Sequence, residues 1–229
     1  MKKLLSLLLL GTMTWPAFAQ KIIDKTLPFS NGQQVNLDLK FADDIKISYW
    51  DKKEVYMKVR VEINRGKLND ALRVETASQP KEISMKTDLD QELIKHGKHE
   101  DCSGNRYTQY NKDGNVVCSQ IDYEVFLPRQ AALKVETISG NIHIQDANGA
   151  VYAKSISGFV DMNWSESKGA NVSMKSITGE LYSDLDIRFT NKKEKPAIVG
   201  YELAGTFNGG GAEVRLESIS NNIYLRRKN

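Results

Sequence analysis

One short motif recurs through the C-terminal half of the chain and constrains its fold more than any other feature. Four segments carry Ile, then Ser or Thr, then Gly or Asn. The last residue of the motif is Gly140, Gly158, Gly179 and Asn221, so the spacings are 18, 21 and 42 residues. A fixed period of this length is the signature of a repeat architecture. Because 42 is twice 21, we expect a fifth, degenerate unit around Gly200.

Apolar residues recur at fixed distances from the last residue of the motif. Within each segment they alternate with polar residues, which predicts β-strands. Between five and two positions before the glycine the phase slips by one residue, which marks a bend. Glycine supplies backbone freedom at such a bend, and Asn221 is the next best residue for a positive φ. The recurring residues stand seven before (Leu133, Val151, Val172, Val214), five before (Val135, Ala153, Met174, Leu216), two before (Ile138, Ile156, Ile177, Ile219) and two after (Ile142, Val160, Leu181, Ile223).

These units must stack, because a strand–bend–strand unit of about 20 residues cannot bury its own apolar face. The sequence therefore predicts an all-β fold, a single-stranded β-solenoid or β-helix-like stack. Its interior would hold Ile on Ile, with a ladder of Ser and Thr hydroxyls beside them. A twisted sandwich of meandering strands is the alternative. We expect residues 129–229 to form this region and residues 20–128 to form a strand-rich N-terminal capping region, continuous with it.

The N-terminus has the pattern of a secretory signal peptide over residues 1–19. Two lysines precede the apolar run 4–10, and Ala17-Phe18-Ala19 provides the small residues of a cleavage site. Cleavage after Ala19 would leave a chain that begins at Gln20, where no cysteine is available for a lipid anchor. No later apolar stretch is long enough to span a membrane. The expected location is the periplasm, the cell surface or the medium.

Charge excludes two classes of partner. The chain has 32 basic and 29 acidic residues, and removal of Lys2 and Lys3 with the signal peptide leaves 30 − 29 = +1. This balance provides no electrostatic footprint for nucleic acid or for an anionic membrane.

Cys102 and Cys118 are the only cysteines. Between them, Asn111-Lys112-Asp113-Gly114-Asn115 is a turn signal that separates two strand-like runs. A hairpin would bring the cysteines close, and an exported protein meets an oxidising environment. We therefore predict a disulfide, which stabilises by about 3 kcal/mol in the loop-entropy description.

Two stretches resemble a known family. The first is Asp44-Ile45-Lys46-Ile47 with Trp50-Asp51 and Val55, followed by the Ile-Ser-Gly units. The second runs from Phe207-Asn208-Gly209-Gly210-Gly211 through Val214 to Leu225. Together they resemble the bacterial putative-adhesin domain family, a domain of unknown function common in Bacteroidetes envelopes, over most of the mature chain. The resemblance implies a β-solenoid-like fold, export and no known catalytic residues. Asn221 departs from it, since glycine is usual there.

Positions one and three after each glycine are expected on one outer face of the stack. They include aromatic rings beside hydrogen-bonding groups, a combination that suits sugars or extended peptides. The alternative is that the rings pack on one another and stabilise the sheet. The candidate binding residues are His143, Phe159, Asp161, Glu180, Tyr182, Tyr201 and Tyr224.

Nothing in the sequence predicts an enzyme with a bound cofactor. His96, His99 and Glu100 are the only cluster that suggests a metal, but their order is not His-Glu-x-x-His, and lysines and Gly97 surround them. Gly209-Gly210-Gly211 matches no phosphate-binding loop and predicts a tight turn.

The preferred function is a non-enzymatic, adhesin-like binding or structural protein that recognises an envelope glycan or protein. Two alternatives stay open. One is a polysaccharide-acting β-helix enzyme that uses Asp161, Glu180 and His143. The other is the sensor domain of an envelope stress system.

Overall fold

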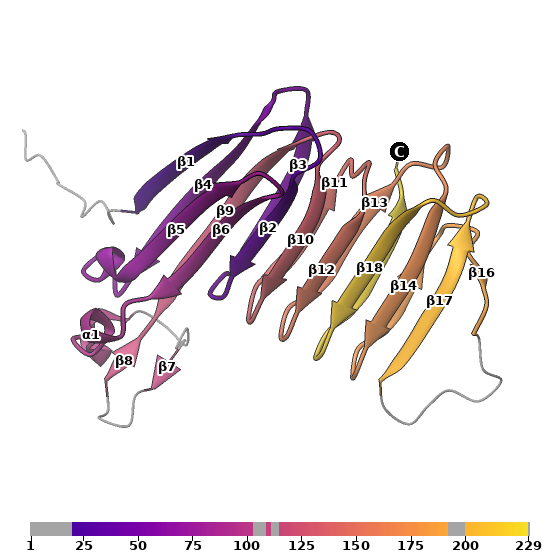
Figure 1. Cartoon of the computed structure of the whole chain (residues 1–229). Coiled ribbons are helices and arrows are strands. Elements are labelled where there is room, and N and C mark those ends of the chain that lie inside the picture. Colours follow the sequence, from indigo (N-terminus) through magenta and orange to yellow (C-terminus); the bar gives the residue numbers. More distant parts are fainter. Residues whose placement is uncertain (1–19, 103–108, 111–114, 192–199, 229) are drawn as a thin grey trace, which may run out of the picture.

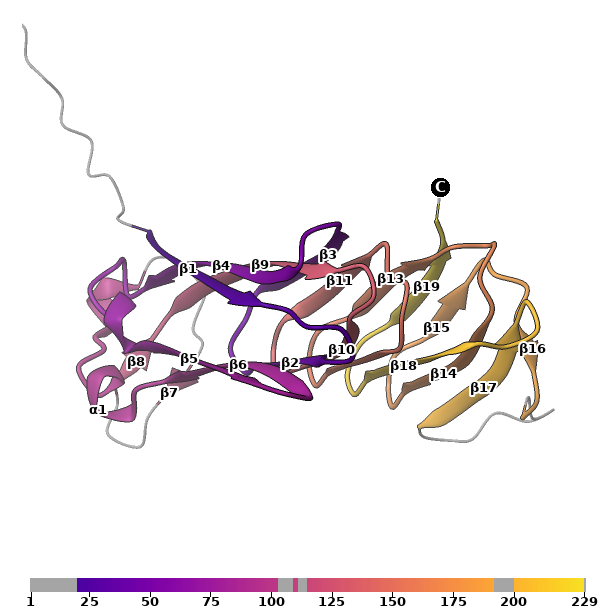
Figure 2. The ribbon, with the colours of Figure 1, turned by 45° about the horizontal axis from the view of Figure 1, so that its top comes forward.

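The computed structural model describes residues 20–102, 109–110, 115–191 and 200–228. The predicted signal peptide, residues 1–19, lies outside them. The described chain is built from strands with three single-turn helical segments, so the all-β prediction is confirmed. Two large sheets pack face to face, and the molecule extends along the direction in which strands follow one another (Figures 1 and 2).

Sheet A has eight strands, with β1 at one edge and the three-residue β15 at the other. In spatial order they are β1 (Lys21–Pro28), β4 (Glu54–Ile63), β9 (Ser119–Pro128), β3 (Asp44–Trp50), β11 (Asn141–Gln145), β13 (Val160–Trp164), β19 (Ile223–Arg227) and β15 (Leu181–Ser183).

Sheet B has nine strands and lies against sheet A. In spatial order they are β16 (Arg188–Phe189), β17 (Tyr201–Phe207), β14 (Ala170–Ser176), β18 (Ala212–Ser218), β12 (Val151–Ser155), β10 (Ala132–Thr137), β2 (Gln34–Leu39), β6 (Glu82–Leu89) and β5 (Leu72–Gln79). The remaining elements are η1 (Asn69–Ala71), α1 (Gln91–Ile94), η2 (His99–Asp101) and the small pair β7 (Gln109–Tyr110) and β8 (Val116–Val117).

Each repeat unit contributes one strand to each sheet. The motif lies at the corner between the two strands, as in β10–β11, β12–β13, β14–β15 and β18–β19. Equivalent strands pair in parallel and in register, so that Val135, Ala153, Leu216 and Met174 form one inward row. The positions seven before, five before and two after the corner are buried, apart from the half-buried Leu181. One continuous apolar core therefore lies between the sheets.

The prediction of a single-stranded solenoid is wrong in its arrangement of strands. The structure has two multi-stranded mixed sheets, with antiparallel pairs at both ends (β1 with β4, β5 with β6, β14 with β17). The units do not follow one another in chain order either. The last unit, β18–β19, lies between β12–β13 and β14–β15, where the yellow β18 separates two orange strands in Figure 1.

Charge explains this order on the outer face of sheet B. The position four before the corner is Lys154 in β12 and Lys175 in β14, while β18 carries Glu217 there. Chain order would place the two lysines on neighbouring strands. The observed register pairs each lysine with Glu217 instead. Opposite charges on neighbouring strands stabilise a sheet and like charges destabilise it, so the side chains favour the insertion of β18.

The corner glycines are required for space and not for a positive φ, which corrects the sequence interpretation. Gly140, Gly158 and Gly179 are absent from the positive-φ glycines. A Cβ on Gly158 would lie 2.0 Å from the carbonyl oxygen of Gly140, and one on Gly179 would lie 2.1 Å from that of Asn221. Stacked corners thus bring backbones into contact, and a side chain has no room between them.

The isoleucines of the motif do not form the interior stack that the sequence predicted. Ile138, Ile156 and Ile177 are about two-fifths exposed, because they lie on the outside of the corner. The predicted hydroxyl ladder exists and lies inside. The buried Ser155 hydroxyl donates to the Gly140 carbonyl and accepts from the Gly158 amide, both at 2.8 Å. Ser218 and Ser176 repeat this pattern in the next two layers.

The segment around Gly200 does not form the repeat unit that the sequence predicted. Gly200 has a positive φ of 66° and precedes β17, which pairs antiparallel with β14 instead of adding a parallel layer. Gly209 and Gly210 have positive φ and form the turn between β17 and β18, as predicted.

The disulfide between Cys102 and Cys118 is confirmed, with a Cα–Cα distance of 5.8 Å. It closes the excursion between β6 and β9 that contains α1 and η2.

Candidate functional site: the outer face of sheet A

The two outer faces of the molecule differ in chemistry. On sheet A, six of the seven neighbouring strands from β4 to β15 each direct one ring outward, and Phe159 directly precedes the seventh, β13. All seven rings are half-buried or exposed. On the central strands of sheet B, from β6 to β14, Tyr152 is the one outward ring and the rest are charged or small polar side chains. We call the rings of sheet A the aromatic track; they are Tyr56, Phe126, Trp50, His143, Phe159, Tyr224 and Tyr182.

The C-terminal part of the track contains most of the residues predicted as a site. His143, Asp161, Tyr224 and Tyr182 occupy one row across four strands. Phe159 makes edge contacts with His143 and with Tyr224, at centroid distances of 5.0 and 6.2 Å. The Tyr182 and Tyr224 rings are parallel and 5.1 Å apart. These side chains therefore form one continuous surface.

The two predicted acids on this surface already have partners. Asp161 accepts from Arg226 at 2.9 Å, and that guanidinium also lies 4.8 Å from the Tyr224 ring centroid. Glu180 accepts from the Tyr182 hydroxyl, which raises the pKa of that tyrosine. Asp161 lies on β13 and Glu180 directly precedes β15, with β19 between these two strands. Each acid is thus engaged by a neighbouring side chain on its own part of the face.

Tyr201 does not belong to this face. It opens β17 in sheet B and pairs with Ser176, because the unit expected around Gly200 is an antiparallel strand. The expectation that placed it in the outer row is therefore wrong.

The N-terminal part of the track is a second aromatic cluster that sequence reasoning did not identify. Trp50 and Phe126 stack with ring centroids 5.0 Å apart, and Tyr56 completes a triangle with them, at 6.2 Å from Trp50 and 6.1 Å from Phe126. Lys52 lies 4.5 Å above the Trp50 ring. The Tyr56 hydroxyl donates to Asp24, and this raises the pKa of the tyrosine.

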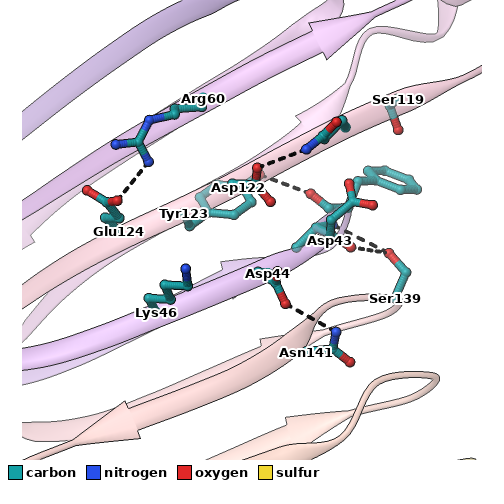
Figure 3. Close-up of a pocket in the computed structure, with 13 residues that line it drawn as sticks. Asp43, Asp44, Lys46, Arg60, Ser119, Asp122, Tyr123, Glu124, Ser139 and Asn141 are labelled. Atoms are coloured by element: carbon teal, nitrogen blue, oxygen red, sulfur yellow. Dashed lines mark hydrogen bonds and ion pairs between the residues drawn. The ribbon is translucent and has the colours of Figure 1, made fainter.

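Beside this cluster lies a charged groove of about 760 Å³ (Figure 3). Arg60 donates to Glu124 at 2.7 Å, and this ion pair lowers the pKa of the Glu124 carboxyl and raises that of Arg60. Asn141 donates to Asp44 at 3.1 Å. Glu124 thus stays ionised at neutral pH and is unsuited to act as a general acid.

A second, smaller groove of about 310 Å³ joins the two aromatic clusters. Phe126 lies on one side of it and His143 on the other, with β3 between them. Its lining also includes Lys46, Ser48 and Gln145. The aromatic track thus consists of two ring clusters, one on β4, β9 and β3 and one from β11 to β15, with this depression between them.

The weak metal cluster finds no support in the described part of the chain. There, no three His, Cys, Asp or Glu side chains converge in a way that could hold a metal ion. His99 begins η2, and His96 lies in the turn before it.

The missed residues had one usable signal in the sequence. Ile45 aligns with Ile142 and Leu37 with Val135, so the segment 34–50 is a further repeat unit. It was hidden because one extra residue stands before its corner and Asp43 takes the place of glycine. Aligning by apolar residues alone would have placed Lys46 in the row of His143.

In the described residues, no helix has the length and apolar character needed to cross a membrane.

No family model and no curated protein matches the sequence. Two solved structures are similar to this chain to different degrees. A "putative cell adhesion protein" from Clostridium sporogenes is 14% identical, with a TM-score of 0.54, over 92% of this chain and 100% of that one. A "putative adhesin" from Bacteroides fragilis is 8% identical, with a TM-score of 0.34, over 92% and 98%. The first likeness shows a shared fold.

Proposed function

We propose that this chain is an exported, non-enzymatic binding protein of the cell envelope, adhesin-like in character, and that the outer face of sheet A is its binding surface. One observation carries the proposal: seven outward rings gather on sheet A, against one, Tyr152, on the central strands of sheet B. A protein that needs only a solvated exterior has no reason to place seven rings on one sheet and charged ladders on the other. Partly exposed apolar surface of this extent marks interaction sites.

Two further findings support export and binding. The disulfide is typical of proteins that mature in an oxidising compartment. The acids of the face are engaged in ion pairs and hydrogen bonds, so they act as a polar frame around the rings and not as a catalytic pair. The resemblance to putative adhesins, in the sequence and in the solved fold, agrees with this role. The ligand class at this level is an envelope glycan or protein.

The test compares capture from an envelope extract by the mature chain and by variants. Tyr182→Ala with Tyr224→Ala removes the stacked pair at the exposed end of the track. We expect the double variant to keep its fold by circular dichroism and to lose most of the captured material. The matched control is Tyr152→Ala, which removes a ring from the opposite face. Equal capture by all three proteins would end the proposal, and an unfolded double variant would assign the rings to packing.

A further inference from the structure

We infer that the ligand is a linear, uncharged polysaccharide that lies across the strands of sheet A along the aromatic track. This inference rests on the proposed function, because it names the ligand class of the same face.

The length and spacing of the track favour an extended ligand with a repeating unit. Neighbouring strands of a sheet are about 4.8 Å apart, so the rings extend across seven consecutive strands, over about 29 Å. Each ring lies in contact range of the next within the two clusters. A small molecule would cover one or two rings only. In a chain of identical sugars, each sugar has the same apolar face. Such a chain can therefore repeat one contact, between this face and an aromatic ring, at successive strands.

The polar groups between the rings favour a ligand without charge. The neutral hydrogen-bonding side chains of the face are Ser48, Asn141, Gln145, Asn163 and Asn222. Arg60 and Arg226 are engaged by Glu124 and Asp161, and Lys46 lies opposite Glu124 on the neighbouring strand. A face with balanced charges offers little attraction to a charged polymer but many donors and acceptors to hydroxyl groups.

A peptide fits this face less well. Peptides that bind sheets add a strand to an open edge, where backbone groups are free, and place side chains in pockets. The track crosses interior strands, whose backbone groups pair with their neighbours. The depression at its centre combines polar groups of Lys46, Ser48 and Gln145 with the apolar surface of Phe126, and it lies over β3, whose backbone pairs with strands on both sides.

The central depression is the most specific subsite. Phe126 and His143 stand on strands two positions apart, a separation of about 10 Å. The space between them can seat one sugar ring between two aromatic side chains, with Lys46, Ser48 and Gln145 in reach of its hydroxyl groups.

The experiment uses the mature chain, residues 20–229, and named probes. Affinity electrophoresis against amylose, hydroxyethylcellulose, a β-1,3-glucan, xylan and mannan identifies a bound polymer. Calorimetry then follows oligosaccharides of that polymer with increasing length. We expect affinity to rise with length until the oligosaccharide spans the track and then to level off. Sodium chloride at 0.5 M should leave the affinity nearly unchanged. A strong loss of affinity in salt would overturn the uncharged ligand.

Two variants test whether one ligand uses both clusters. Trp50→Ala and Tyr182→Ala each should weaken polymer binding by about two- to tenfold, and the double variant should show the product of the two effects. A short oligosaccharide should respond to one of them only. Tyr152→Ala on sheet B should change nothing. If Trp50→Ala lowers the melting temperature, Phe126→Leu replaces it, since Leu keeps apolar packing and removes the ring.

The envelope extract separates failure of this inference from failure of the proposed function. Periodate cleaves sugar rings that carry vicinal hydroxyl groups, an endo-β-1,3-glucanase degrades the 1,3-linked glucan that periodate leaves intact, and protease destroys proteins. Capture that either sugar-degrading treatment abolishes supports a glycan, including one outside the panel. Capture that survives both of these treatments but not protease, and still needs the sheet A rings, would overturn the glycan and leave the binding face in place. Capture that is independent of those rings would remove both.

Discussion

At the repeat's corner, Gly158 shows how a stacked backbone selects a residue by volume. Between the neighbouring layers, a Cβ at this position would lie only 2.0 Å from the Gly140 carbonyl oxygen. Gly158→Ala should therefore force two layers apart. We expect a loss of more than about 2 kcal/mol in the free energy of unfolding, as for other forced overpacking. Urea denaturation of the purified chain measures it. The control is Ser157→Ala, next in sequence and exposed, which should be close to neutral.

In the pair Ser155 and Ile156 the polar residue is buried and the apolar residue is partly exposed, the opposite of the usual arrangement in a protein core. Ser155 is fully buried and bridges two backbone groups, while Ile156 is 38% exposed. Ser155→Ala should cost about 1–3 kcal/mol, because it leaves a buried carbonyl and amide without their partner. Ile156→Ser should cost only about 1–2 kcal/mol, because 38% of the side chain is already in water. A loss above about 3 kcal/mol for Ile156→Ser in urea unfolding would return the isoleucine to the interior.

Alternation in the sequence was sufficient to predict which residues of each strand are buried. The rows through Val135 and Ile142 point inward as expected. Side chains alternate between the two faces of a strand, so once one face is apolar the residues that point into the core are fixed. The corner was not predictable in this way. A phase slip shows that the chain bends, but it does not show on which side of the bend Ile138 lies.

Among the elements, the position of β18 depends on its charged row. Glu217 lies between Lys154 and Lys175 on the outer face of sheet B. Glu217→Lys would place three lysines on adjacent strands. We expect it to destabilise the chain by about 1–2 kcal/mol at low salt, with part of the loss recovered at 0.5 M sodium chloride.

A fully reversed row tests whether this effect belongs to the row and not to Glu217 alone. Lys154 also lies opposite Glu136, and Lys175 also lies opposite Glu202. The reversed variant therefore combines Glu217→Lys with Lys154→Glu, Lys175→Glu, Glu136→Lys and Glu202→Lys, and it should recover most of the stability. Glu217→Gln serves as the neutral control, because it removes the charge without reversing it. If the reversed variant is no more stable than Glu217→Lys, the contact of Glu217 with Arg215 at 2.6 Å accounts for the loss instead.

The repeat predicts which residues form strands. It does not predict which strands lie next to each other in a sheet. The spacing of 18 and 21 residues gives the length of a unit and says nothing of which unit stacks on which. The pairing instead depends on side chains that lie far apart in sequence, such as Lys154 and Glu217. The aromatic track was half predicted for the same reason: Tyr182 and Tyr224 fall inside the motif's frame, while Trp50 and Phe126 lie in units whose corners lack it.

For the whole molecule, the inserted C-terminal unit makes the two ends of the repeat region interdependent. β18 and β19 pair with strands on both sides. The strands beyond them in the two sheets, β14, β15 and β17, are therefore joined to the rest of each sheet through β18 and β19. A polypeptide emerging in order cannot complete either sheet until its C-terminus is available. Such non-local pairing makes folding slow.

Deletion of residues 212–229 tests this dependence. In a stack built in chain order, loss of the last unit would expose one layer and leave the others folded. Here it removes an interior strand from sheet B and, from sheet A, the strand that joins β15 to β13. We therefore expect β14, β15, β16 and β17 to lose their attachment to the rest of the molecule, and the shortened chain to lose its single cooperative unfolding transition. Removing β1, residues 20–28, is the matched control, because β1 is an edge strand paired on one side only. Hydrogen exchange on the intact chain gives an independent readout: amides of β18 and β19 should be among the slowest, although terminal segments usually exchange fast. Fast exchange there, with a folded 20–211 chain, would show that β18 and β19 are dispensable and that the two halves of each sheet hold together without them.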